Sequence, residues 1–138
     1  MSDPNSPAEK PSEKRQAAIL VVEDSPAMRQ LLSLAVRRHG AKVTEAADGL
    51  AALRLLASER FDLMFVDLNM PILDGMKLIK RVREDAALAK MPICVCTTES
   101  AAATEAQARS LGADFFVKKP ISRRDVEEVL QKALGHAG

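Results

Sequence analysis

The chain has 138 residues, 47% of them hydrophobic, which is enough for one globular domain with its own core. Twenty basic and nineteen acidic residues leave a net charge of +1, so no overall field favours nucleic acid or an anionic membrane. No apolar run approaches the roughly 18 residues of a membrane span, and residues 1–16 lack the apolar stretch of a signal peptide. We therefore expect a cytoplasmic protein without nucleic-acid or membrane partners.

The composition changes after residue 16. Residues 1–16 hold three of the seven prolines and almost no apolar side chain, so they cannot bury enough surface to offset the entropy lost on ordering. They are predicted to be a disordered tail, followed by one domain at 17–134 and a short C-terminal tail at 135–138. Cys94 and Cys96 are two residues apart in a predicted strand, which disfavours an unstrained disulfide and fits a reducing compartment.

Strand and helix patterns alternate five times along the domain. The predicted strands are residues 17–22, 42–46, 61–66, 93–97 and 113–117. A helix follows each strand, and the first carries Met28, Leu31, Leu32, Ala35 and Val36 on its predicted apolar face. The predicted helix starts are Ser25-Pro26, Asp48-Gly49, Asp74-Gly75, Ser100 and the capping-box pair Ser122 and Asp125. Short connections between such units predict an α/β fold, a doubly wound five-stranded parallel sheet.

Polar side chains that can do chemistry follow the predicted strands. In open doubly wound sheets, ligands bind outside the carboxyl ends of the strands. The side chains at those ends are Glu23, Asp24, Asp67, Thr97, Thr98, Lys118 and Lys119. Each one alone has an ordinary structural interpretation, as a turn carboxylate, a strand-end threonine or a surface lysine. Together they indicate one shared site, and strand alternation favours Lys119 over Lys118 as its lysine.

Three converging carboxylates need positive charge. Two carboxylates about 4 Å apart repel by about 4 kcal/mol at an effective dielectric constant near 20, and one lysine does not balance three acids. Either one carboxyl group stays protonated, or a divalent cation completes the site. Oxygen ligands favour a hard ion, and a shallow, hydrated site suits Mg²⁺ better than Ca²⁺. An aspartate beside Mg²⁺, with lysine and threonine donors opposite, fits phosphoryl transfer onto the carboxylate.

Four pieces of sequence carry a resemblance to a known family. They are VVEDSPAMR at 21–29, FVDLNMPILDG at 65–75, the strand-end Thr97 and FFVKKP at 115–120. The chain resembles, over 17–134, the receiver domain of two-component response regulators, specifically the stand-alone CheY-like type. The resemblance implies a flavodoxin-like sheet of strand order 2-1-3-4-5 and a cis bond before Pro120. It also implies a sensor histidine kinase or phosphotransfer protein as the phosphodonor.

The same resemblance implies a role for each matching residue. Asp67 stands at the position of the phospho-acceptor, and Lys119 at that of the lysine that contacts the phosphoryl group. Glu23 and Asp24 stand at the positions of the acidic pair that binds Mg²⁺ together with Asp67, and Asn69 would add its backbone carbonyl.

A second group of matching residues concerns switching and lifetime. Thr97 resembles the hydroxyl that closes on the phosphoryl group, and Phe116 the aromatic residue that then swings inward. Asn69, Thr98 and Glu99 stand at positions that tune phosphoryl hydrolysis in the family. Thr98 is bulkier than the Ala or Gly usual there.

These observations predict a signalling module that is phosphorylated on Asp67 and changes the surface of its fourth helix, fifth strand and fifth helix for a downstream protein target. Such a module catalyses its own phosphorylation and dephosphorylation without being a conventional enzyme. One alternative is a receiver-like interaction module that works without phosphorylation. Another is a different enzyme, but a dehalogenase-type phosphatase needs an acid where the chain has Asn69. A flavodoxin-like cofactor binder would place its phosphate against Glu23 and Asp24.

Overall fold

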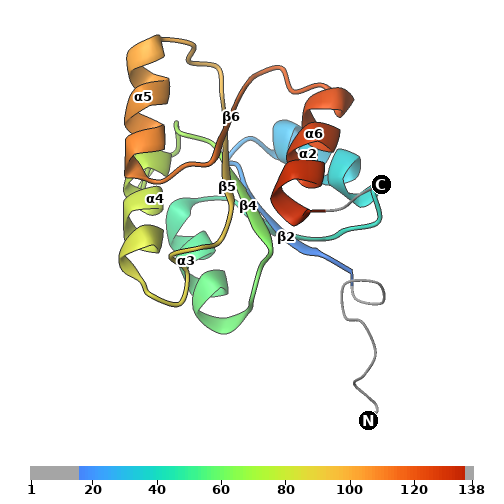
Figure 1. Ribbon diagram of the computed structural model, residues 1–138, viewed down its shortest axis with the longest axis horizontal. Coiled ribbons are helices and arrows are strands. Elements are labelled where there is room, and N and C mark those ends of the chain that lie inside the picture. The colour runs from blue at the N-terminus through green and yellow to red at the C-terminus, as the bar shows by residue number, and fades with distance from the viewer. Residues whose placement is uncertain (1–15, 136–138) are drawn as a thin grey trace.

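The computed structural model describes residues 16–135 (Figure 1). Within them, five parallel strands form one sheet in the order β3-β2-β4-β5-β6, which is 2-1-3-4-5 counted along the chain. The strands are β2 (Ala18–Val22), β3 (Lys42–Ala46), β4 (Leu63–Val66), β5 (Ile93–Thr97) and β6 (Phe115–Lys118). The predicted α/β fold and strand order are confirmed. Apart from Gln16 and Gly135, both predicted tails lie outside the described residues, so the domain limits stay a prediction.

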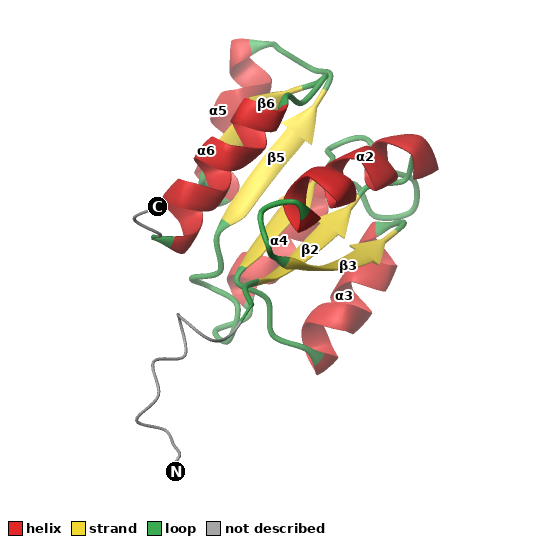
Figure 2. Ribbon diagram, turned by 90° about the vertical axis from the view of Figure 1, so that its right-hand side faces the viewer, coloured by secondary structure: helices red, strands yellow, loops and turns green. Residues whose placement is uncertain are grey.

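Helices cover both faces of the sheet (Figures 1 and 2). The helices are α2 (Pro26–Arg37), α3 (Gly49–Ser58), α4 (Gly75–Glu84), α5 (Ala102–Leu111) and α6 (Arg123–Leu134). Buried side chains of α2 and α6 pack with one set of strand residues, and those of α3, α4 and α5 pack with the other set. The sheet is therefore the middle layer of three.

The strand residues alternate between these two cores. In β2, Ile19 and Val21 pack on the side of α2 and α6, while Leu20 and Val22 pack on the side of α3, α4 and α5. Because both faces of an internal parallel strand are buried, its sequence is apolar throughout. The more polar β3 lies at the sheet edge, as its composition predicts.

Most helix starts follow the predicted caps. Ser25, Asp48, Asp74 and Ser122 are N-cap residues whose side chains accept a backbone N–H from the first turn, and Ser122 forms the predicted capping box with Asp125. The prediction for α5 was wrong, because its N-cap is Ala101 and not Ser100. The backbone N–H groups of Thr104 and Glu105 both donate to the Ala101 carbonyl, so the first turn closes one residue later.

Three strands and one buried position also differ from prediction. The first strand begins at Ala18 rather than residue 17, the third begins at Leu63 rather than residue 61, and the fifth is 115–118 rather than 113–117. Ala113 follows the C-cap of α5 and its N–H donates to the Ala108 carbonyl of that helix, so it does not join the strand. Leu31 is 62% exposed instead of facing the core. The inner side of α2 is taken by Leu32 and Val36.

Candidate functional site

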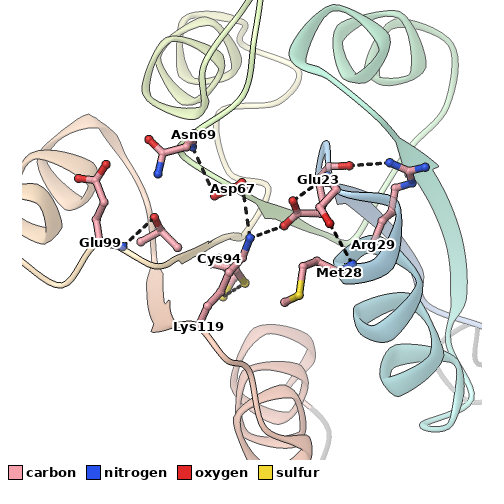
Figure 3. A network of polar contacts seen from close by, with 11 residues as sticks. Glu23, Met28, Arg29, Asp67, Asn69, Cys94, Glu99 and Lys119 are labelled. Carbon is pink, nitrogen blue, oxygen red and sulfur yellow. Dashed lines mark hydrogen bonds and ion pairs between the residues drawn. The ribbon is translucent and has the colours of Figure 1, made fainter.

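The carboxyl ends of four strands meet at one edge of the sheet, and the predicted site residues lie there (Figure 3). Glu23 and Asp24 follow β2, and Asp67 follows β4. Thr97 is the last residue of β5, and the backbone N–H of Lys119 donates to its carbonyl at 2.7 Å, which holds the end of β6 beside it. The fold thus brings together side chains that are far apart in the sequence.

Three carboxylates form the acidic part of the site. One oxygen each from Glu23, Asp24 and Asp67 can be chosen so that all lie within 4.8 Å of one another. Glu23 is 3% and Asp67 is 5% exposed, whereas Asp24 is exposed to solvent. Carboxylate oxygens at this spacing, open to water on one side, fit a hard divalent cation such as Mg²⁺.

Lys119 joins two of these acids. Its Nζ lies 2.5 Å from Oε1 of Glu23 and 3.5 Å from Oδ2 of Asp67, and its side chain is 9% exposed. Burial lowers the pKa of Lys119, but the hydrogen bond to Glu23 and the charge of Asp67 outweigh burial, so the pKa is raised. Lys118, the neighbouring lysine, is exposed. The ammonium of Lys119 therefore stays protonated at neutral pH.

Glu23 experiences the opposite balance. Burial raises its pKa, and the charge of Asp67 raises it further, against the hydrogen bonds from Lys119 and from the Ser25 backbone N–H, which lower it; the pKa is raised overall. The ammonium faces two carboxylates, while Glu23 faces one ammonium and a like charge. In Glu23, burial outweighs the hydrogen bonds that lower the pKa, whereas in Lys119 the two carboxylates outweigh burial, so both partners of one ion pair have raised pKa values. The acids are left short of positive charge.

The loop after β4 fixes Asp67. The Asn69 backbone N–H donates to Asp67 Oδ1 at 3.3 Å, and Asp74 caps α4 by accepting the N–H of Lys77. A Cβ on Gly75 would come within 2.4 Å of the Asp67 carbonyl oxygen, so only glycine lets α4 start this close to the acid. The Asp-Gly pair of the motif is thus a packing device rather than part of the chemistry.

Thr97 and its neighbours line the other side of the site. Thr97 is fully buried, and its Oγ1 accepts the backbone N–H of Glu99 at 3.2 Å. Thr98 is exposed. Asn69 and Glu99, both predicted to tune hydrolysis, line one polar cavity of about 430 Å³. Its complete lining is Leu68, Asn69, Met70, Asp74, Met76, Glu99, Thr104 and Gln107.

Phe116 lies in β6 beside Val95 of β5, two residues before the strand ends at Thr97. Its ring is half-buried and packs against the core on the side of α3, α4 and α5. The peptide bond between Lys119 and Pro120 is cis, as the resemblance implied.

The sequence patterns did not predict Arg29 as a site residue, although its side chain contacts the site. Its Nη1 donates to the backbone carbonyl of Glu23 at 2.8 Å (Figure 3). The only signal was its position, a basic residue in the first helical turn after an acidic pair. Nothing local indicates that its side chain turns back toward the strand.

The profile of the Response regulator receiver domain matches residues 19–131. The chain belongs to the response regulator receiver family. Receiver domains bind Mg²⁺ in an acidic active site, and this chain has an acidic cluster of three carboxylates. The family is that of CheY-type response regulators in two-component signal transduction.

Relatives of this receiver domain include chemotaxis proteins. Chemotaxis protein CheY-3 of Vibrio cholerae is 34% identical over 115 residues, which cover 83% of this chain and 88% of that protein. The structure of V. cholerae CheY4 superposes with a TM-score of 0.81 at 32% identity, covering 86% of this chain and 98% of that chain.

A second solved structure bears on the acidic cluster. It is the receiver domain of a sensor histidine kinase from Pseudomonas aeruginosa PAO1, with a TM-score of 0.81 at 27% identity, covering 88% of this chain and 99% of that one. A magnesium ion is coordinated in its active-site cleft.

In the receiver domain described here, none of the helices within residues 16–135 has the length and hydropathy to cross a bilayer.

Proposed function

We propose that this receiver domain accepts a phosphoryl group on Asp67 from a sensor histidine kinase or a phosphotransfer protein in the cytoplasm. The observation that carries the proposal is the position of Asp67, which is buried beside two other carboxylates and 3.5 Å from the Lys119 ammonium. A nucleophilic carboxylate with a fixed cation beside it is what phosphoryl transfer to an acid requires.

The donor set fits Mg²⁺. Asp24 and Asp67 would hold the ion with the backbone carbonyl of Asn69, and Glu23 would complete the acidic pair. A bound Mg²⁺ would offset the negative charge of the phosphoryl oxygens. Because Asp24 is exposed, an ion held there would keep water ligands on its solvent side, and phosphoryl oxygens could replace them without rearrangement of the buried acids.

The transfer itself uses residues of this chain. One carboxylate oxygen of Asp67 attacks the phosphorus of a phosphohistidine, an O–P bond forms, and the P–N bond breaks. The electron pair of that bond returns to the imidazole of the donor. The ring leaves as neutral imidazole when its second nitrogen already carries a proton, and otherwise it takes up a proton from water. Lys119, whose Nζ lies 3.5 Å from Oδ2 of Asp67, and the Thr97 hydroxyl would donate to the new phosphoryl oxygens.

Phosphorylation of Asp67 then changes a distant surface. Thr97 Oγ1 leaves the Glu99 N–H to meet the phosphoryl group, and the space it vacates lets Phe116 move inward from its half-buried place. The downstream target reads the face formed by α5, β6 and α6. Asn69, Thr98 and Glu99 set how fast water removes the phosphoryl group.

The phosphodonor docks over the acidic edge and α2. An apolar groove of about 240 Å³ between α2 and α6 supports this, because the exposed Leu31 and Leu34 lie in its lining. Pro120, which follows Lys119 directly, also lines the groove. A protein that covers the groove would therefore also reach the edge where Asp67 lies.

Beryllofluoride with Mg²⁺, a mimic of the phosphoryl group, tests this function. Amide NMR shifts of Thr97, Phe116 and Lys119 should move on titration of the wild-type protein. Acetyl phosphate with Mg²⁺ should add one phosphoryl group to wild type by intact mass and none to Asp67→Asn. Lys119→Ala should still take up some phosphoryl group but leave the Phe116 resonance close to its unmodified position.

Two outcomes would decide against the proposal. If wild type responds to neither reagent, the protein is an interaction module that works without phosphorylation. If Lys119→Ala and wild type show the same change at Phe116, Lys119 does not couple the site to the switch.

A further inference from the structure

A second cation, Arg29, contacts the backbone of the acidic pair Glu23 and Asp24. Its Nη1 donates to the Glu23 carbonyl at 2.8 Å, and its Nε lies 3.3 Å from Oε1 of Glu45 on the edge strand β3. The Arg29 side chain is 19% exposed and that of Glu45 is 31% exposed. One guanidinium thus connects Glu45 of the edge strand β3 to the peptide between Glu23 and Asp24.

That peptide lies where the sheet ends. The Glu23 backbone N–H still donates to the Ala46 carbonyl at 3.1 Å, as a strand residue would. The chain then turns into α2, so the Glu23 carbonyl leaves the hydrogen-bond ladder and needs another donor. Arg29 supplies that donor and fixes the plane of the peptide from which the Asp24 side chain departs.

The position of Arg29 in its helix is otherwise unfavourable. It lies at the end of the first turn of α2, where the helix dipole is positive and disfavours a cation. Glu45 offsets this charge from the neighbouring strand. Helix energetics alone do not explain an arginine here, whereas the contact with the acidic turn does.

We propose that Arg29, anchored by Glu45, is a positioning residue for the Mg²⁺ site: it orients the Glu23–Asp24 peptide so that the Asp24 carboxylate faces Asp67. This inference rests on the proposed Mg²⁺ site. It adds a residue that touches neither the ion nor the phosphoryl group and acts through the backbone.

The charge of Arg29 and its proposed positioning role predict opposite effects of its removal on Mg²⁺ affinity, so the two can be distinguished by experiment. Arg29 is a cation near the place where a dication binds, so on charge alone its removal strengthens Mg²⁺ binding. If Arg29 positions the acidic pair, its removal weakens binding, as loss of an outer contact of a metal ligand does.

The experiment measures the Mg²⁺ dissociation constant by NMR titration of backbone amides at constant ionic strength. Arg29→Gln is expected to bind Mg²⁺ about tenfold more weakly than wild type. Arg29→Lys, which keeps the charge and loses the two-pronged geometry, should fall between the two, and Glu45→Gln should weaken binding in the same direction. Arg37→Gln is the matched control, because Arg37 also approaches Glu45, at 4.0 Å, and is half-exposed.

Each outcome decides one point. If Arg29→Gln binds Mg²⁺ as tightly as wild type or more tightly, or if Arg37→Gln weakens binding as much, the positioning role is wrong. If wild type itself binds no Mg²⁺, the proposed function fails instead. Should Arg29→Gln not fold, Arg29→Lys carries the test, because it keeps the positive charge and its loss of Mg²⁺ affinity then reports the position of the acidic pair alone. Its urea unfolding curve without Mg²⁺ checks its structure.

Discussion

Lys119 is the side chain whose positive charge contacts two of the three site carboxylates. It is 96 residues away from Glu23 in the sequence, yet the two side chains form a buried ion pair. A buried pair contributes stability only when both charges keep their partners, and Lys119 has a second one in Asp67. The ammonium is thus held in place before any phosphoryl group arrives.

The raised pKa of Lys119 predicts a dependence of stability on alkaline pH. The folded protein holds the lysine proton above the ordinary pKa of 10.5, so its contribution is complete below that pH and is lost as the pH rises through the folded pKa. The difference in unfolding free energy between wild type and Lys119→Met should be constant near pH 8 and shrink above about pH 10.5. Urea unfolding across this range checks it, and a difference that stays flat would contradict the shift.

Ile72 is strained, and its loop carries Asp67. It has a φ of +71°, a left-handed conformation that costs an L-residue about 1–2 kcal/mol, and its side chain is 74% exposed. Asparagine adopts this conformation readily, so Ile72→Asn should raise the unfolding free energy by about 1 kcal/mol. Ile72→Val keeps the branched Cβ and should give no gain. Equal stability of all three proteins in urea would show that the strain is absorbed elsewhere.

At the scale of elements, α5 differs from the other helices at its start. Ser25 and Ser122 cap their helices through the side chain, whereas the cap residue of α5 is Ala101, whose methyl group cannot accept a hydrogen bond. Only Ala108 of α5 is fully buried. This helix borders the polar cavity of the site and belongs to the proposed target surface, so a weakly fixed helix lies where the switch must act.

The missing cap makes a testable prediction. Ala101→Ser should stabilise the protein by about 1 kcal/mol, because Ala101 already has the extended backbone of an N-cap. Ser25→Ala, which removes an existing cap, should destabilise it by about the same amount. Urea unfolding gives both values, and amide hydrogen exchange should show the Ala101→Ser gain in the first turn of α5. A gain spread evenly over the chain would argue against a local cap.

At the scale of the whole molecule, the acidic cluster predicts that metal binding and folding are linked. Glu23 and Asp67 are buried with less positive charge than they need, so an ion that binds only the folded state should stabilise the entire domain. The shape of the sheet makes this possible, since the ends of β2 and β4 are neighbours in it.

Mg²⁺ should therefore raise the unfolding free energy by about 2.7 kcal/mol when present at 100 times its dissociation constant. Asp24→Asn should lose most of this gain, because it removes an exposed ligand without disturbing the core. Asp74→Asn is the control, since Asp74 lies on the neighbouring loop and caps α4. Thermal unfolding with and without Mg²⁺ measures the effect, and an equal gain in Asp24→Asn would place the ion elsewhere.

Much of this fold was predictable because its signals are local. The apolar run of β2 and the caps at Ser25 and Asp48 depend on neighbours in sequence, and a parallel sheet places every strand end at one edge. That is why Asp67 and Lys119 could be assigned to one site. The prediction for the start of α5 was wrong for the same reason: Ser100 has a side chain suited to an N-cap, but it lies one residue before the actual N-cap, Ala101.

By itself the sequence determined the alternation of strands and helices, the edge where the charged side chains lie and the family to which the chain belongs. Only the tertiary structure decided which charges meet: that Lys119 pairs with Glu23 as well as Asp67, that Arg29 turns back to the Glu23 carbonyl, and that Leu31 is exposed. The reason is physical. Periodicity reports which face a residue is on, whereas an ion pair depends on distances of a few ångström between segments that only packing brings together.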